Sequence, residues 1–236
     1  MPGPTRPLAL DARDVAWRFL VGAGVGAFVG LVLGGIGGRI VMLVLRLASD
    51  DTVLGIESDD GFEIGRFSTS TVFLLQVAAG LGGATGVLYV VLRSALPGRG
   101  RALVWGLAAA LLLGAGIVRT DGLDFTALDP KPFAVASFVL LPGVAAFLIA
   151  VLVERALALE PWSRRWLAVA LVLCALALNV ALAAVAIAAL AALGLRRIPA
   201  VARPVLTVAR VAVPVLLLFV SVRSGLDLYH DAAAIL

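Results

Sequence analysis

The chain alternates long apolar runs with short polar segments, and the lengths of the runs predict helices that cross a membrane. A helix needs roughly 20 apolar residues, at about 1.5 Å each, to cross about 30 Å of hydrocarbon. Six runs reach or approach this length: 17–47, 71–92, 102–118, 133–153, 166–195 and 205–222. We therefore expect an all-α protein, a polytopic transmembrane helix bundle of about six helices. The sixth helix is the weakest of these predictions because its run contains Arg210 and Pro214.

The polar segments divide the chain into three parts. They are a cytoplasmic N-terminal segment at 1–16, the transmembrane bundle at 17–222 and a C-terminal tail at 223–236. Between the first two runs, short apolar stretches at 52–56 and 62–67 flank the turn sequence SDDG. Apolar stretches around such a turn are typical of a hairpin. We therefore expect a small extracellular β-hairpin between helices one and two.

Charged residues alternate in sign from one predicted loop to the next. Arginines gather before the first run, between runs two and three, and between runs four and five, whereas 48–70 and 119–132 are rich in aspartate. Arginine-rich loops stay on the cytoplasmic side of a membrane. We therefore expect a multi-pass protein of the bacterial plasma membrane with both termini in the cytoplasm. Three arginines within 196–203 contradict this orientation, so either the rule fails locally or 196–210 lies in the interface and the sixth crossing is absent.

The composition supports a membrane location. Hydrophobic residues make up 62% of the chain and charged residues 14%, which is too little polar surface to cover a soluble domain. Lys131 is the only lysine among 19 basic residues, and the arginines stand at the ends of the apolar runs, where they can reach lipid headgroups. A nucleic-acid-binding protein would cluster them with aromatic residues on one polar face. We expect membrane lipids as partners and no nucleic acid.

Small residues recur every four positions along the first run, so they share one face of the predicted helix. They are Gly22, Gly26, Gly30, Gly34 and Gly38, and the second run carries a matching row of Ala78, Gly82 and Gly86. Glycine lets two helix backbones approach closely in lipid. The pattern favours helix packing between the first two helices of one chain. The alternative is a seam between copies of the chain, or a helix that lines a pore.

Two arginines within the runs are candidate contacts for a lipid headgroup or another anion. Arg39 lies about 20 residues after Phe19, near the outer interface, where snorkelling is the simplest interpretation and an ion pair with an outer-loop aspartate the next. Arg210 precedes Pro214 by four residues, so its carbonyl loses its usual N–H donor and a kink is expected. The six runs contain no aspartate or glutamate, which disfavours ion-coupled transport.

The sequence carries no pattern typical of a catalytic, metal or cofactor site. Cys174 is the only cysteine and His230 the only histidine, so there is no intramolecular disulfide and no zinc or haem site built from several such residues. The acidic segment 48–70 does not match the spacing of a calcium-binding loop. Hydrolase and nucleotide-binding motifs are absent. We expect no catalytic residues, no metal and no cofactor, and therefore not an enzyme.

Four stretches of the chain carry a resemblance to a known group of proteins. They are GGRIVMLVLRLASDD, DDGFEIGRFS, DGLDFTALDP and the terminal DAAAIL. They resemble stretches of a family of small uncharacterised multi-pass membrane proteins of actinobacteria, over predicted helices one to four and the tail. The resemblance implies a multi-pass plasma-membrane protein and adds no substrate.

Two hypotheses for the function follow. The first is a non-enzymatic structural or partner-binding membrane component that associates with copies of itself or with another membrane protein. The second is a small channel or transporter that uses the glycine-rich first helix. A faint internal repeat supports the second, because a shift of 61 residues places Gly82 on Gly143 and Ala84 on Ala145. Flux measurements in liposomes would distinguish the two hypotheses.

Overall fold

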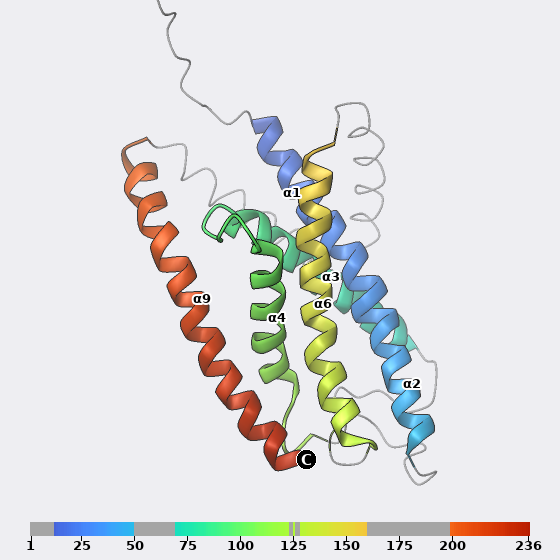
Figure 1. The fold of residues 1–236 in the computed structure, drawn as a ribbon. Helices are drawn as coiled ribbons and strands as arrows, with labels where there is room; N and C mark the ends of the chain where they lie inside the picture. Colours follow the sequence, from blue (N-terminus) through green and yellow to red (C-terminus); the bar gives the residue numbers. More distant parts are fainter. Residues whose placement is uncertain (1–11, 50–68, 123–124, 126–127, 160–198) are drawn as a thin grey trace, which may run out of the picture.

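The computed structural model describes residues 12–49, 69–122, 125, 128–159 and 199–236. In these ranges the protein is a bundle of helices without strands (Figure 1). An all-helical fold is therefore confirmed for the described residues. The predicted β-hairpin and the fifth predicted run, 166–195, lie outside them.

The first rod of the bundle consists of three consecutive helical segments. They are α1 (Ala12–Val29), the π-helical η1 (Gly30–Gly37) and α2 (Gly38–Ala48). The backbone stays in the right-handed helical region at both Gly37 and Gly38, so the rod is continuous through them. A π-helical segment has a wider turn than an α-helix and often behaves as an inserted residue. The residues of the rod that face its neighbours are therefore spaced differently within η1 than in a regular α-helix.

The remaining described helices are α3 (Thr69–Leu92), α4 (Arg101–Ile117), α6 (Lys131–Leu157) and α9 (Pro199–Ile235). Local sequence explains some of their starts. Gly100 precedes α4 with a φ of 80°, a left-handed conformation that glycine adopts without strain. Pro130 precedes α6 and another proline lies in its first turn, where a missing N–H costs no hydrogen bond.

Four stretches are long and apolar enough to cross a membrane, namely Trp17–Ala48, Thr71–Leu92, Lys131–Leu157 and Val211–Ile235. The helix Arg101–Ile117 is apolar but shorter. In the described ranges there are thus five helical rods, four of them candidate spans, instead of the six predicted.

The last span differs from its prediction. The sequence predicts a sixth run that ends at residue 222, followed by a tail at 223–236. In the structure α9 continues through Pro214 and Arg223 to Ile235. The predicted runs contain no carboxylate, but the candidate span Val211–Ile235 contains Asp227 and the candidate span Lys131–Leu157 contains Glu154.

The helices pack in pairs. The α1 and η1 segments pack on α3, α4 packs on α6, and α9 packs on α4. One buried cluster joins Val21, Tyr89, Trp105 and Ile149 from four different helices. A second cluster, at the other end of the bundle, joins Leu45, Val118, Leu128 and Ile235, together with neighbouring apolar residues. The two clusters hold the helices together at the two ends of the bundle.

The start of α1 and the end of α9 lie at opposite ends of the bundle (Figure 1). The start of α9 is at the same end as the finish of α6, and Ile235 packs beside Leu45 and Leu128 at the opposite end. The prediction that both termini are cytoplasmic concerns their sides of a membrane, and it stays a prediction. The end that carries Arg18, Arg93 and Arg101 is called the arginine end below.

Candidate functional site

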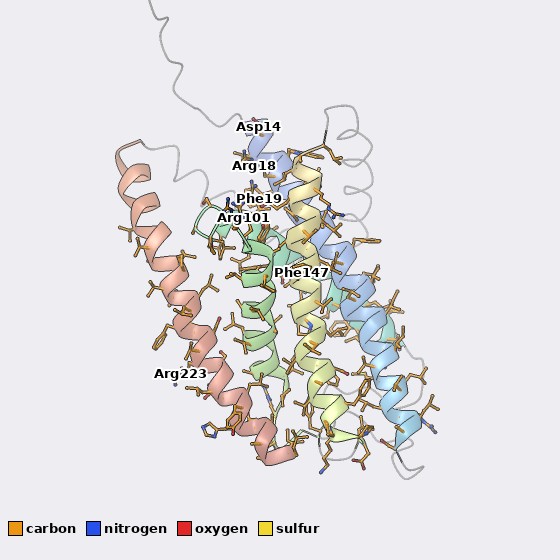
Figure 2. All side chains as sticks on the ribbon, viewed as in Figure 1. Asp14, Arg18, Phe19, Arg101, Phe147 and Arg223 are labelled. Carbon is orange, nitrogen blue, oxygen red and sulfur yellow. The ribbon has the colours of Figure 1, made fainter. Side chains whose placement is uncertain are left out.

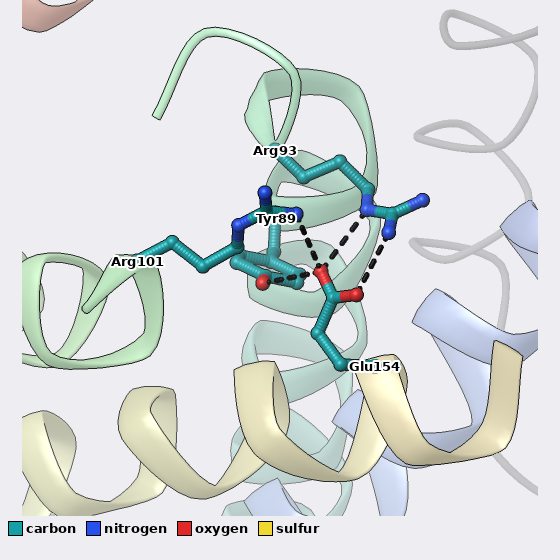
Figure 3. A network of polar contacts seen from close by, with 4 residues as sticks. All are labelled: Tyr89, Arg93, Arg101 and Glu154. Atoms are coloured by element: carbon teal, nitrogen blue, oxygen red, sulfur yellow. Dashed lines mark hydrogen bonds and ion pairs between the residues drawn. The ribbon is translucent and has the colours of Figure 1, made fainter. Parts of the chain in front are cut away.

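A network of four side chains joins three helices at the arginine end (Figure 3). The Tyr89 hydroxyl donates a hydrogen bond of 2.8 Å to Glu154 Oε1. Arg93 donates from Nε to Oε1 at 3.1 Å and from Nη2 to Oε2 at 2.7 Å, a bidentate pair. Arg101 Nη1 donates to Oε1 at 3.1 Å. One carboxylate therefore receives four hydrogen bonds, and the network carries a net charge of +1.

Local structure brings these side chains together. Tyr89 lies in the last turn of α3, and Arg93 directly follows that helix. The Arg93 N–H still donates to the Tyr89 carbonyl oxygen at 2.7 Å, so the two side chains share one face. Arg101 begins α4 directly after the left-handed turn at Gly100, which returns the chain towards the bundle. Glu154 lies in the last turn of α6. The three helix ends are thus held at one carboxylate.

The network is partly shielded from solvent. The Tyr89 side chain is fully buried, and its ring centroid lies 5.9 Å from that of Trp105. The Arg93, Arg101 and Glu154 side chains are 23%, 28% and 33% exposed. Charge-assisted hydrogen bonds at such a boundary stabilise more than an exposed ion pair does, because water screens them less.

A pocket of about 420 Å³ adjoins the network. It lies between the start of α1 and the ends of α3 and α6; Figure 2 labels Asp14 and Arg18 at this end of the bundle. The lining consists of Asp14, Trp17, Arg18, Arg93, Glu154, Leu157 and Ala158. Its size is within the range of small-molecule sites, and its lining mixes charged groups with an indole and aliphatic carbon.

The structure places the predicted glycine row against α3 over part of its length. A Cβ atom built on Gly22 would lie 2.8 Å from the Gly86 carbonyl oxygen, and one built on Gly30 would lie 2.8 Å from the Gly82 Cα. Gly26 faces Gly82 equally closely, and Ala78 lies opposite Gly30. No side chain fits at these positions without moving a backbone.

The close approach ends at Gly34. A Cβ on Gly34 would make an ordinary contact of 3.4 Å with the Ala78 Cβ, and one on Gly38 would lie 3.9 Å from Leu141 of α6. Gly35, one residue further along, faces α3 instead, with its built Cβ 2.6 Å from Leu75 Cδ2. The π-helical turn of η1 causes this shift by one residue, which a regular four-residue count does not reveal.

Of the two predicted lipid or anion contacts, Arg39 lies in α2 and donates a hydrogen bond of 3.0 Å from Nη2 to the Thr71 hydroxyl of α3. Thr71 is buried. Arg39 therefore connects the first rod to the start of α3. Arg210 lies in α9, and its side chain is outside the described residues.

A second polar feature lies on α9. Arg223 and Asp227 are both exposed, and neither forms a hydrogen bond or ion pair among the described residues. The buried positions Ser221, Leu228 and Ile235 face the bundle. At about 100° per residue, Arg223 lies roughly 160° around the helix from Ser221. Its side chain accordingly points away from the bundle (Figure 2).

The contacts between α4 and α9 give the depth of Arg223 in the bundle. A Cβ on Gly225 would lie 3.5 Å from Leu111 Cδ2, and one on Gly114 would lie 3.4 Å from Leu228 Cδ2. The two parallel helices thus match with an offset of 114 residues, which puts Arg223 level with Ala109. Ala109 is the middle residue of α4. Arg223 is therefore level with the centre of an apolar helix.

Sequence reasoning missed both features. Glu154 directly follows the fourth apolar run, so the count of charged residues within the runs does not include it. A single carboxylate next to arginine-rich loops was a usable signal, since unpaired charge at a helix end attracts its opposite. Arg223 and Asp227 were assigned to a tail. Their spacing of four residues inside a continuing apolar pattern was the corresponding signal.

Comparisons with protein-family models, with curated proteins and with solved structures each found no match for this chain. The resemblance to actinobacterial membrane proteins therefore stays a prediction. Over its described residues, the fold defines the class of the protein as a helix bundle with four helices long and apolar enough to cross a membrane.

Proposed function

We propose that the protein is a non-enzymatic, partner-binding component of the bacterial plasma membrane that associates through the outer face of α9. The observation that supports this proposal is the exposed pair Arg223 and Asp227 at the level of the middle of α4. The arginine end is proposed to face the cytoplasm, and membrane lipids surround the rest of the bundle.

The cost of leaving these charges in lipid supports a partner. A charged arginine or aspartate at the centre of a membrane helix costs about 3 kcal/mol by insertion measurements. Arg223 is 12 residues from either end of the candidate span Val211–Ile235, so it is farther from an interface than the arginines near helix ends that reach one by snorkelling. A partner that supplies opposite charges removes much of this cost.

A second copy of the chain is the partner that the charges favour. Arg223 and Asp227 are opposite in sign and one helical turn apart, so the face is complementary to itself. In a two-fold arrangement of parallel α9 helices, Arg223 of each copy can reach Asp227 of the other. Apolar side chains on the same face, including Phe219 and Leu226, are more than half exposed and would pack around the charged pairs.

The alternative hypothesis of a channel rested on the glycine row. Gly22, Gly26 and Gly30 contact α3 of the same chain, so in this arrangement they are not available to line a pore. A channel would instead have to form between copies at the α9 face. No observation favours that over simple association.

Charge reversal tests the proposal. The full chain is reconstituted in lipid vesicles at decreasing density, and copies per complex are counted by single-molecule photobleaching. Arg223→Asp and Asp227→Arg should each weaken self-association about tenfold or more, because each brings like charges together (about 1.4 kcal/mol per factor of ten). Mixing the two variants, or combining both changes in one chain, should restore association. Arg99→Asp, which reverses an exposed arginine in the turn before α4, is the matched control.

Each outcome bears on the proposal. A protein that is monomeric at every density, or a combined variant that fails to regain association, would overturn self-association through α9. If the protein is monomeric alone but binds a different membrane protein, and Arg223→Asp abolishes that binding, the second copy is the wrong partner and the α9 face is the right surface.

A further inference from the structure

The pocket at the arginine end has charged hydrogen-bond donors on its lining. Trp17 also lines the pocket, but its indole Nε1 is buried away from the open space and has no hydrogen-bond partner among the described residues. The indole therefore contributes an aromatic wall, and the arginines supply the donors that a ligand can reach.

Two arginines supply the donors on this lining. Arg93 uses Nε and Nη2 to bind Glu154, and its remaining Nη1 points away from that carboxylate (Figure 3). Arg18 follows Trp17 on α1, is exposed, and forms no hydrogen bond or ion pair among the described residues. The free donors therefore come from two helices, α1 and α3.

The acceptors on the lining are largely occupied. Glu154 Oε1 already accepts hydrogen bonds from Tyr89, Arg93 and Arg101, and Oε2 accepts one from Arg93. Asp14, one turn before Arg18, is the other carboxylate of the lining and is exposed. The pocket thus combines an excess of N–H donors with one available carboxylate.

We propose that this pocket binds a phosphate group. Phosphate oxygens accept several charge-assisted hydrogen bonds from different directions, which matches two guanidinium groups that come from separate helices. The volume of about 420 Å³ exceeds what a bare phosphate ion needs and leaves room for a phosphodiester headgroup. Asp14 then accepts a hydrogen bond from a hydroxyl group of that headgroup, which a free phosphate lacks.

The position of the pocket agrees with this ligand. It opens at the arginine end, beside the helix ends where basic side chains meet anionic headgroups. Trp17 and Leu157 provide an apolar wall for the first carbons of an acyl chain. The proposal is independent of α9, because none of the residues that line the pocket belongs to that helix.

Calorimetric titration tests the proposal and separates its two sources of phosphate. The full chain, in a non-ionic detergent without phosphate, is titrated with dihexanoyl-phosphatidylglycerol and, separately, with inorganic phosphate. Saturable binding of the short-chain lipid alone identifies a lipid headgroup as the ligand. Comparable binding of inorganic phosphate identifies the free ion, and both results support a phosphate site.

One variant assigns the binding to the pocket. Arg18→Gln removes one charged donor and should weaken binding about tenfold. Arg99→Gln removes an exposed arginine that does not line the pocket and should leave binding unchanged. Absence of saturable binding for both probes, or unchanged binding in the Arg18→Gln variant, would overturn the proposal.

Discussion

At the scale of single residues, Glu154 is the centre of the arginine end. Its carboxylate accepts from Tyr89, Arg93 and Arg101, which belong to α3 and α4, while Glu154 itself belongs to α6. An exposed ion pair contributes little to stability, but here the acceptors are saturated and one donor is fully buried. The network therefore keeps three helix ends, and the pocket beside them, in fixed positions.

The glycine contacts give a prediction at the same scale. Gly30→Leu should destabilise the protein by about 1–3 kcal/mol or more, because its side chain would meet the backbone of α3 at Ala78 and Gly82. Phe28→Leu is the control, since Phe28 is 55% exposed and points away from α3. Thermal unfolding in detergent measures both. Equal melting temperatures for the Gly30→Leu variant and the unmodified protein would show that the two helices do not pack as described.

Residue-scale prediction from sequence holds along α1 and up to the first residue of η1. The four-residue rule placed Gly22, Gly26 and Gly30 on one face, and the structure puts all three opposite α3. It failed to locate Gly34 and Gly38, which do not approach α3 as closely. The cause is the π-helical geometry of η1, which the pattern of residues in the run does not predict.

At the scale of helices, α9 departs most from its prediction. The charges at 223 and 227 resembled the start of a polar tail, yet the helix continues to Ile235. Its inner face, with Ser221, Leu228 and Ile235, is what packs on the bundle. The packing of Leu228 and Ile235 on the bundle, rather than local hydropathy, accounts for the continuation of this helix past Arg223.

Cysteine labelling distinguishes the two interpretations of 223–236. In a Cys174→Ser background, Leu226→Cys should resist a water-soluble maleimide in sealed vesicles, whereas Leu236→Cys should react. Leu226 is 57% exposed on the protein surface, so only lipid or a partner would protect it. Rapid labelling of Leu226→Cys would mean that this part of α9 lies in water and that Arg223 and Asp227 carry no penalty.

At the scale of the whole molecule, the two polar ends of the bundle differ in chemistry. The arginine end carries the Glu154 network and the pocket, while the opposite end is closed by the apolar cluster around Leu128 and by Ser49. The Ser49 hydroxyl donates to the Asp129 carbonyl oxygen at 3.2 Å. The same hydroxyl oxygen accepts a hydrogen bond of 2.8 Å from the Asp129 N–H. The end of α2 is thereby connected to the start of α6.

The orientation of the molecule yields a further prediction. Because the arginine end should face the cytoplasm, Gly98→Cys should label only from inside intact cells. Leu236→Cys should label only from outside, since the end of α9 is at the opposite end of the bundle (Figure 1). Labelling of both positions from the same side would contradict the arrangement of α9 and restore the earlier expectation for the termini.

The sequence by itself determined that the chain forms helices long and apolar enough to cross a membrane, because the lengths and polarity of its runs depend only on local composition. It also indicated the row of small residues along the first rod, because helical periodicity is local as well. Only the tertiary structure decided which charges meet. Glu154 contacts residues more than 50 positions away in the sequence. Arg223 lies level with the middle of α4 because of the register in which α9 packs on α4. Such contacts depend on how helices pack against one another, and hydropathy along the chain does not encode that register.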